Sequence, residues 1–203
     1  MNAKRHICPN CLRPQATCIC RFVAPVRSVA DVLILQHPME VANAKNSGRL
    51  LHLSLPGSKL EVGETFDALA TGGRRAVLLY PETPGDRSLG IAPPPPFDES
   101  WRAEELVLVV LDATWRKSRK MLYLNPALQA MPRLPLRGTP PSHYLIRKAH
   151  KPDQLSTLEA TAYALAQLEG DEHRYDPLIA AFDNFVAQQQ ALAARGAALS
   201  PGA

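Results

Sequence analysis

One acidic residue stands between an apolar run and a row of cations in the middle of the chain. Residues 106–111 read LVLVVL, and Asp112 ends this run. Because the run is short and rich in β-branched Val, it predicts a strand buried on both faces of a parallel sheet. Open α/β sheets bind their ligands at the carboxyl ends of such strands. The four cations that follow predict a site for a polyanionic substrate, and they are Arg116, Lys117, Arg119 and Lys120.

A second group of reactive side chains lies at the start of the sequence. All four cysteines, Cys8, Cys11, Cys18 and Cys20, occur there as C-x-x-C followed by C-x-C. Four thiolates on short turns match a tetrahedral Zn²⁺ site. A disulfide framework is disfavoured in a cytoplasmic chain, and no thioredoxin-like βαβ unit surrounds the C-x-x-C motif. We therefore expect residues 1–27 to form a four-cysteine zinc knuckle, which is too small to have a core of its own.

The charges are distributed unevenly along the chain. The net charge is +4, yet residues 113–152 contain nine Lys or Arg and no acid, whereas residues 153–203 contain seven acids and two Arg. Such clustering favours binding to nucleic acid over an ordinary solvated basic surface. Residues 1–5 are not followed by an apolar segment, and no aliphatic run reaches membrane-spanning length. We expect a cytoplasmic protein with no membrane partner, and the oligomeric state stays open.

The remaining pattern alternates apolar runs with helical segments. We expect strands at 28–36, 76–80, 106–111, 133–136 and 142–147. We expect helices from Asn46 or Ser47 to about Leu53, from Thr114 onward, at 156–169 and at 176–194. This order predicts an α/β domain with a mainly parallel sheet over residues 28–195, followed by a frayed tail at 196–203. Neither G-x-G-x-x-G nor G-x-x-x-x-G-K-[ST] occurs, which disfavours a dinucleotide site or a P-loop.

The segment 112–115 and several other short motifs occur in a fixed order along the chain. Residues 112–115 read DATW, a D-x-T-W signature, so the sequence resembles the DTW-domain tRNA-uridine aminocarboxypropyltransferases. The resemblance covers most of residues 8–168. It also includes the Cys knuckle, NSGRL at 46–50, YP at 80–81, RKM at 119–121 and STLEA at 156–160. Ala113 departs from the Gly that relatives often have at this variable position.

The resemblance implies a fold and a reaction. The family is related to the SPOUT-type methyltransferases, whose cofactor lies in a folded-back, often knotted, C-terminal region. It implies that S-adenosylmethionine is the donor and that a uridine of tRNA is the acceptor. The 3-amino-3-carboxypropyl group moves to the imide nitrogen of the base, and 5′-methylthioadenosine is released. A non-catalytic zinc-knuckle RNA-binding protein and an S-adenosylmethionine-dependent RNA methyltransferase are the alternatives.

The resemblance also implies which residues form the site. The catalytic group is Asp112, Thr114 and Trp115. The donor pocket is Tyr80, Pro81, Leu111, Asp112, Ser156, Thr157 and Glu159. The RNA-binding group is Asn46, Ser47, Arg49, Arg116, Arg119, Lys120, Arg147 and Lys148.

Several of these residues have more than one interpretation. Asp112 could act as a general base, orient the cofactor, or cap the helix that begins near Thr114 and Trp115. Trp115 could stack on a base or anchor this helix to the core. Asn46 or Ser47 could instead cap the next helix.

Overall fold

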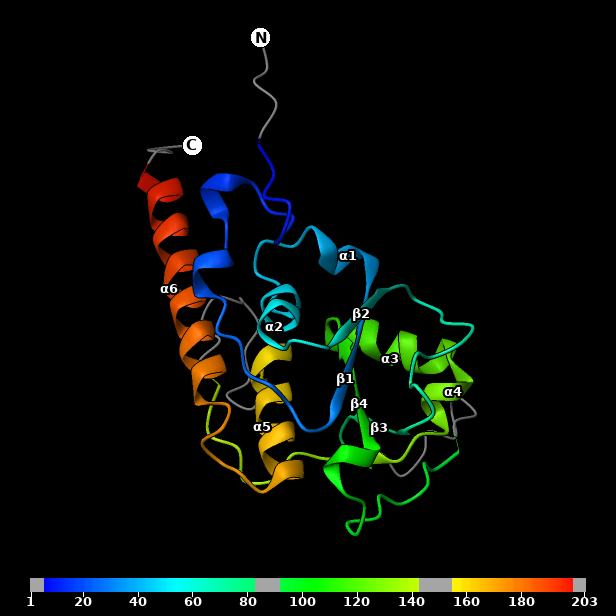
Figure 1. The fold of residues 1–203 in the computed structure, drawn as a ribbon. Helices are drawn as coiled ribbons and strands as arrows, with labels where there is room; N and C mark the ends of the chain where they lie inside the picture. The colour runs from blue at the N-terminus through cyan, green and yellow to red at the C-terminus, as the bar shows by residue number, and fades with distance from the viewer. Residues whose placement is uncertain (1–5, 83–91, 143–154, 199–203) are drawn as a thin grey trace.

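A single sheet forms the centre of the molecule (Figure 1). The computed structural model describes residues 6–82, 92–142 and 155–198. Within these ranges five strands pair in the order β2-β1-β4-β3-β5, and every pairing in the sheet is parallel. The strands are β1 (Asp31–Gln36), β2 (Lys59–Val62), β3 (Arg75–Leu79), β4 (Leu106–Asp112) and β5 (Arg133–Leu134). The predicted α/β class with a parallel sheet is confirmed.

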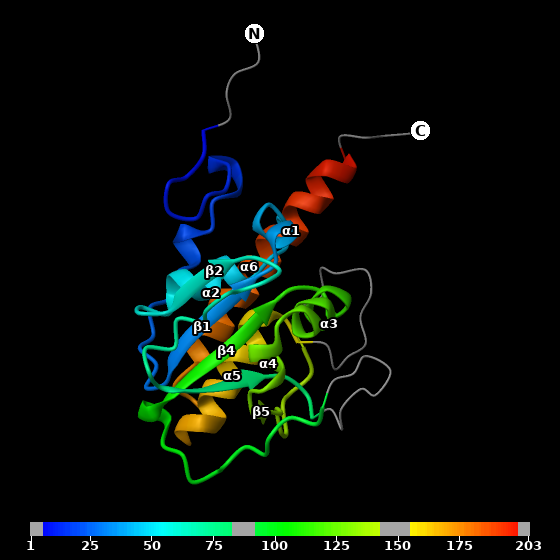
Figure 2. The same ribbon diagram turned by 90° about the vertical axis from the view of Figure 1, so that its right-hand side faces the viewer.

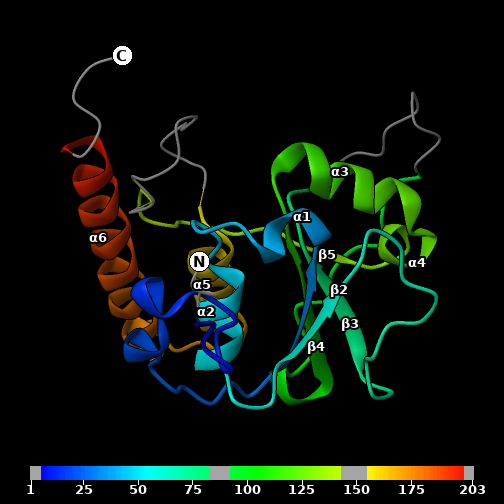
Figure 3. The same ribbon diagram turned by 90° about the horizontal axis from the view of Figure 1, so that it is seen from above.

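Helices cover both faces of the sheet (Figure 3). On one face lie α2 (Gly48–Ser54), α5 (Thr157–Glu169) and α6 (Asp176–Ala198). On the other lie α3 (Trp115–Leu124) and α4 (Pro126–Gln129), while the short α1 (Pro38–Val41) follows β1. The middle strand β4 therefore contributes to two cores. Leu108 and Val110 pack toward the first helical layer, Val107 and Val109 pack toward the second, and all four are at most 3% exposed.

The N-terminal segment packs beside α6 and α2 (Figure 1). It contains two short 3₁₀ turns, Gln15–Thr17 and Cys20–Phe22. Cys8, Cys11 and Ile19 are buried in the same apolar cluster as the first face of the sheet. As expected of a segment without its own core, it is stabilised by contact with the main body.

Most of the predicted elements are present with small shifts of their ends. The structure adds β2, which the sequence analysis missed because this edge strand is only half-buried and has no apolar run. Helix α6 extends to Ala198, so the predicted start of the tail at residue 196 lies inside a helix. The strand predicted at 142–147 falls outside the described residues, apart from Ser142. None of the helices in the described ranges has the length and apolar character needed to cross a membrane.

The order of the strands creates a position for a ligand. From β1 the chain proceeds to β2 on one side, whereas from β4 it proceeds toward β5 on the other (Figure 2). In open α/β sheets, ligands bind at the carboxyl ends of two neighbouring strands whose connections diverge in this way. The last residues of these strands, Gln36 and Asp112, are direct partners in the sheet.

Candidate active site

Asp112 is the centre of a buried hydrogen-bond network at this edge of the sheet. Its side chain is 2% exposed. Oδ2 accepts from Gln36 Nε2 at 2.7 Å and from Asn46 Nδ2 at 2.7 Å, and Oδ1 accepts from Thr157 Oγ1 at 2.7 Å. Gln36 Nε2 also donates to Asn46 Oδ1 at 3.2 Å. One carboxylate thus connects β1, the segment before α2, β4 and the start of α5.

Gly48 is required where the first turn of α2 passes this carboxylate. A Cβ atom built on Gly48 would lie 2.2 Å from Asp112 Oδ2 and 2.6 Å from Asp112 Cγ. The carboxylate cannot move away from this Cβ without breaking its hydrogen bonds to Gln36 and Asn46. The glycine therefore serves the close approach of a backbone to a buried anion.

We expect Gly48→Ala to lower the free energy of unfolding by about 1–3 kcal/mol, because the added methyl group overpacks a fixed site. Urea denaturation measures this change. Gly48→Ala in the Asp112→Ala background is the control, because the carboxylate that the new Cβ would meet is then absent. If Gly48→Ala costs as much in that background as in the wild type, the close approach is not a constraint.

The charge of Asp112 is costly in this position. Burial raises the pKa of its carboxyl group, and the hydrogen bonds from Gln36, Thr157 and Asn46 oppose that shift only in part. A raised pKa in the folded state means that folding takes up a proton at intermediate pH. The resulting stabilisation is present below the unfolded pKa of about 3.9 and is lost as the pH rises through the folded pKa.

The stability of the wild type relative to Asp112→Asn should therefore fall as the pH rises from about 4. The Asn side chain cannot titrate, so the difference between the two proteins isolates this one group. Urea denaturation of both proteins at several pH values measures it. If the wild type instead becomes more stable relative to Asp112→Asn as the pH rises, the pKa of Asp112 is lowered in the folded protein.

The N-terminus of α5 forms the second part of the site. Ser156 caps the helix by accepting from the Glu159 N–H at 3.2 Å, and Glu159 Oε2 accepts from the Ser156 N–H at 2.7 Å, which confirms the predicted capping box. Glu159 is 1% exposed and also accepts from Ser142 Oγ. Its neighbour Thr157 donates to Asp112. The capping box and the Asp112 network are therefore continuous.

Aromatic side chains lie at the carboxyl ends of β3 and β4. Tyr80 is buried, and its ring meets the ring of Trp115 edge-on with centroids 5.8 Å apart. Trp115 is half-exposed, and Thr114 is the N-cap residue of α3 without a side-chain capping bond. Leu111 is partly buried against the α3 side of the sheet and Pro81 is exposed. No described hydrogen bond joins Asp112 to the N–H groups of Thr114 or Trp115, so the structure does not support the capping role for Asp112.

The residues predicted to bind RNA fall into two groups. Asn46 and Ser47 are each 3% exposed, and their side chains bond to Asp112 and to the Leu158 N–H. Both side chains are turned inward, and their contact with RNA stays a prediction. Neither makes a side-chain cap of α2, although Ser47 occupies the N-cap position.

The exposed residues of the predicted RNA-binding group lie on α3. Arg116, Arg119 and Lys120 are exposed on this helix, and Lys120 Nζ also lies 2.8 Å from Glu64 Oε2. Lys117 lies 3.0 Å from the buried Glu40 Oε1 and so stabilises the fold. Arg49 Nη2 donates to the Asn10 carbonyl at 2.8 Å. Arg147 and Lys148 lie outside the described residues.

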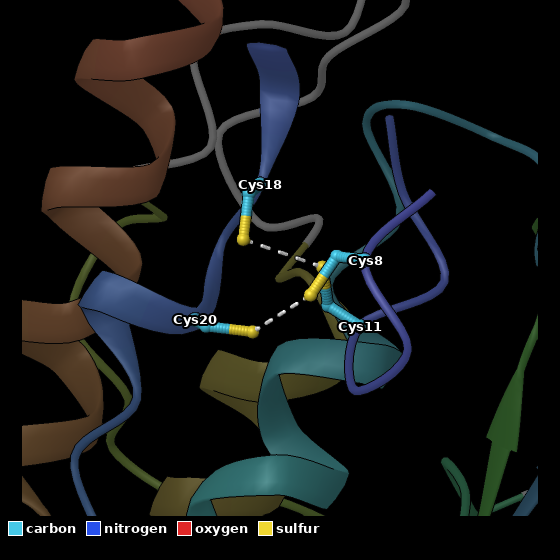
Figure 4. A group of neighbouring side chains, drawn as sticks. All are labelled: Cys8, Cys11, Cys18 and Cys20. Atoms are coloured by element: carbon cyan, nitrogen blue, oxygen red, sulfur yellow. Dashed lines mark hydrogen bonds between the residues drawn. The ribbon is translucent and has the colours of Figure 1, made fainter. Parts of the chain in front are cut away.

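The four cysteine sulfurs converge as the spacing predicts (Figure 4). All lie within 4.8 Å of one another, with 3.6 Å between the Sγ atoms of Cys8 and Cys20 and 3.8 Å between those of Cys11 and Cys18. Zn–S bonds of about 2.3 Å in a tetrahedron place sulfurs about 3.8 Å apart. N–H groups of Cys11 and Asn10 lower the pKa of the Cys8 thiol to about 6, whereas burial and the neighbouring thiols raise the pKa of Cys20. The cluster fits zinc, and no disulfide is formed.

Arg13 connects this cluster to the Asp112 network. It lies between the two pairs of cysteines, and its guanidinium donates to the Ala44 carbonyl at 2.6 Å and to the Asn46 carbonyl at 2.7 Å. It also lies over the ring of Phe185 in α6, 5.1 Å from the centroid. Because Asn46 in turn donates to Asp112, only two residues separate the cysteine loop from the buried carboxylate.

Comparison with known proteins adds to this geometry. A family model described as the DTW domain matches residues 5–190, which is nearly the whole chain. The chain belongs to the DTW domain family. The resemblance based on the DATW motif and its companions is confirmed.

The DTW protein also has curated relatives. It is 27% identical over 196 residues to tRNA-uridine aminocarboxypropyltransferase 2 of Macaca fascicularis, covering 87% of this chain and 61% of the relative. It is 30% identical over 178 residues to the protein of that name in Drosophila melanogaster, covering 82% and 68%. It spans 57% of the relative of the same name in Mus musculus. No solved structure matches the DTW protein.

Proposed function

We propose that this DTW protein is a tRNA-uridine aminocarboxypropyltransferase. It would transfer the 3-amino-3-carboxypropyl group of S-adenosylmethionine to the imide nitrogen of a tRNA uridine, releasing 5′-methylthioadenosine and the imide proton. The observation that supports this most is the joining of two family motifs, DATW and STLEA, into one site through the bond between Asp112 and Thr157. That site lies where the connections of β1 and β4 diverge.

The charges of the site suit a cationic donor. Asp112 and Glu159 are two buried carboxylates at adjacent elements, and both are placed by hydrogen bonds. They create a negative potential that favours the sulfonium and the amino group of the donor. The half-exposed ring of Trp115, which the buried Tyr80 meets edge-on, offers a surface on which a base can stack.

We assign Asp112 to positioning, not to proton abstraction. Its oxygens already accept from three side chains and it is 2% exposed, so a uracil N–H cannot reach it without displacing a donor. Positioning is decisive for this reaction, because the sulfonium activates three carbons and the product depends on which one faces the nucleophile. A fixed Asp112 network therefore helps to determine which carbon of the sulfonium faces the nucleophile.

The tRNA would bind along the exposed side of α3. Arg116, Arg119 and Lys120 lie on this helix next to Trp115, so phosphate contacts and the reacting base can be reached together. A uridine that is to react must lie in a loop or leave its stack. Arg147 and Lys148 stay in this proposal on the strength of the sequence.

Neutralising Arg116 and Lys120 by Gln should weaken tRNA binding and reduce its dependence on salt. Each phosphate contact that is lost lowers the slope of log K against log salt by roughly 0.7–0.9. Because Lys120 also pairs with Glu64, we expect Arg116 to contribute the larger part. Arg74→Gln is the control, because Arg74 pairs with Asp31 at the opposite edge of the sheet. If the slope of log K against log salt is the same for the wild type and the double variant, α3 does not contact the RNA.

The proposal also covers the division of the chain into a zinc knuckle and a catalytic domain. Residues 1–27 would form a structural zinc knuckle held by Cys8, Cys11, Cys18 and Cys20, and residues 28–195 the catalytic domain. The all-parallel sheet is compatible with a SPOUT-like, knotted domain, but residues 143–154, which lead into α5, lie outside the described ranges. Four free cysteines suit a cytoplasmic protein.

Product analysis tests the proposed activity. The protein is incubated with S-adenosylmethionine and tRNA that lacks the modification, and the digested nucleosides and small products are identified by mass spectrometry. We expect aminocarboxypropyluridine and 5′-methylthioadenosine. Methyluridine with S-adenosylhomocysteine would indicate a methyltransferase instead. Calorimetry that detects tRNA binding but no donor binding would indicate a non-catalytic RNA-binding protein.

A further inference from the structure

Arg133 is a buried cation, and three of its five N–H donors, the one on Nε and the two on Nη2, have no acceptor within the described residues. It begins β5 and is 3% exposed. Nη1 donates to the Leu128 carbonyl at 2.9 Å. Nε and Nη2 are also buried, and they have no hydrogen-bond partner within the described parts of the chain. Leaving such donors without an acceptor is unfavourable, so their retention points to a ligand.

The two unpaired groups have a defined geometry. In a guanidinium, Nε–H and one Nη–H point in the same direction along one edge, and this edge binds a carboxylate or phosphate through two parallel hydrogen bonds. The Nη1 contact to Leu128 fixes the plane of the group while leaving that edge available. Burial lowers the pKa of Arg133, so an anion beside it would relieve the cost of the buried charge.

Arg133 lies beside Tyr80 on the α3 and α4 side of the sheet, whereas Asp112 faces α2 and α5 on the other side. A donor that contacts both must therefore cross the carboxyl edge of the sheet. The guanidinium carbon of Arg133 is 5.5 Å from the centroid of the Tyr80 ring, and Tyr80 contacts Trp115. In the sheet it is level with Leu78 and hence with Val109, three residues before Asp112 and two strands away. These steps correspond to roughly 10 Å along the strands and roughly 10 Å across them. Arg133 also lines an open groove of about 1200 Å³ with Pro135, Arg137 and Tyr163, and none of the residues predicted for the donor pocket lines this groove.

The other place for an anion, the N-terminus of α5, is already occupied by the protein itself. The Leu158 N–H donates to Ser47 Oγ and the Glu159 N–H donates to Ser156 Oγ. The carboxylates of Asp112 and Glu159 lie beside them and would repel a further negative charge. The acidic side of the site therefore suits the cationic part of the donor and leaves its carboxylate to be bound elsewhere.

We propose that Arg133 binds the carboxylate of the donor's aminocarboxypropyl group through Nε and Nη2. This assignment rests on the proposed function. The donor would then be held at both ends of the transferred group, with its cationic centre toward the buried acids and its carboxylate on Arg133. Such two-point binding presents one of the three sulfonium-linked carbons to the acceptor and explains why the chain needs an Arg that the fold leaves partly unpaired.

The test compares two ligands that differ only in the carboxylate. Calorimetric titration gives the affinities of the full-length protein for S-adenosylmethionine and for decarboxylated S-adenosylmethionine. We expect the wild type to prefer the carboxylated ligand by about 10- to 100-fold, and we expect Arg133→Gln and Arg133→Lys to lose most of this preference. Because each variant serves as its own reference, a moderate loss of stability does not obscure the ratio. Arg137→Gln, in the same groove but exposed and paired with Glu99, should keep the wild-type ratio.

The outcomes separate this inference from the function on which it rests. If the wild type binds both ligands equally, or if Arg133→Gln keeps the preference, the assignment is overturned while donor binding stands. If Arg133→Gln weakens only the binding of tRNA, the edge of the guanidinium holds an RNA phosphate and the carboxylate assignment is wrong. If the wild type binds neither ligand, the proposed function itself fails.

Discussion

Replacement of Asp112 by Ala should lower the free energy of unfolding by about 2–6 kcal/mol and abolish transfer. The variant leaves the donors on Asn46 and Thr157 without their acceptor, at about 1–3 kcal/mol each, whereas Gln36 Nε2 keeps Asn46 Oδ1. It also frees the start of α5 from the end of β4, so the two family motifs lose their connection. Urea denaturation and the transfer assay measure both effects.

The variant Asp112→Asn separates the charge from the hydrogen bonds. Its amide oxygen can accept from Gln36 and Asn46, and its amide nitrogen can donate to Thr157, whose hydroxyl can rotate to accept. We expect a folded protein whose affinity for S-adenosylmethionine falls at least about tenfold, or about 1.4 kcal/mol, because the negative charge near the sulfonium is removed. If Asp112→Asn keeps the donor affinity and turnover of the wild type, the carboxylate acts only through its hydrogen bonds.

Replacement of Cys8 by Ser should cause loss of the metal and a large loss of stability. The four sulfurs have the separations of a tetrahedral zinc site, and three ligands hold Zn²⁺ much more weakly than four. We expect about one zinc per chain in the wild type by elemental analysis, little in the variant, and a clear fall in Tm. Arg21→Ala is the control, because Arg21 lies in the same segment and stacks on Phe22 but is not one of the four candidate ligands.

The effect of Cys8→Ser should extend to the donor site. Arg13 stands between the cysteine pairs and holds the carbonyl of Asn46, whose side chain bonds to Asp112. Loss of the metal should therefore weaken donor binding even below the unfolding temperature, and Arg13→Gln should do so while zinc is retained. Unchanged zinc content in Cys8→Ser would refute the metal site. Unchanged donor affinity in Arg13→Gln would refute the connection.

The sequence predicts those features that depend on local pattern. The apolar run before Asp112, the cysteine spacing and the capping box of Ser156 and Glu159 each carry their signal within a few residues, and the structure shows all three as predicted. The partners of Asp112 carry no such signal. Gln36 reaches it only because β1 and β4 are neighbours in register, which no stretch of sequence reveals.

Two features of the site could not be predicted, for the same physical reason. Nothing in the sequence near Asn46 and Ser47 indicates that their side chains are buried beside Asp112 and Leu158. The pattern at 133–136 predicts a strand, but it does not indicate that Arg133 is buried with Nε and Nη2 unpartnered. In both cases tertiary contacts determine the role of the polar side chain, and the apolar pattern of the sequence does not indicate these contacts.

A crystal structure of the full chain with S-adenosylmethionine would show where the donor binds. We predict that the donor lies at the carboxyl ends of β3 and β4, with its sulfonium beside the network of Asp112 and Thr157 and its adenosine near Tyr80 and Trp115. A donor bound at the opposite edge of the sheet, or on the cysteine knuckle, would contradict the account.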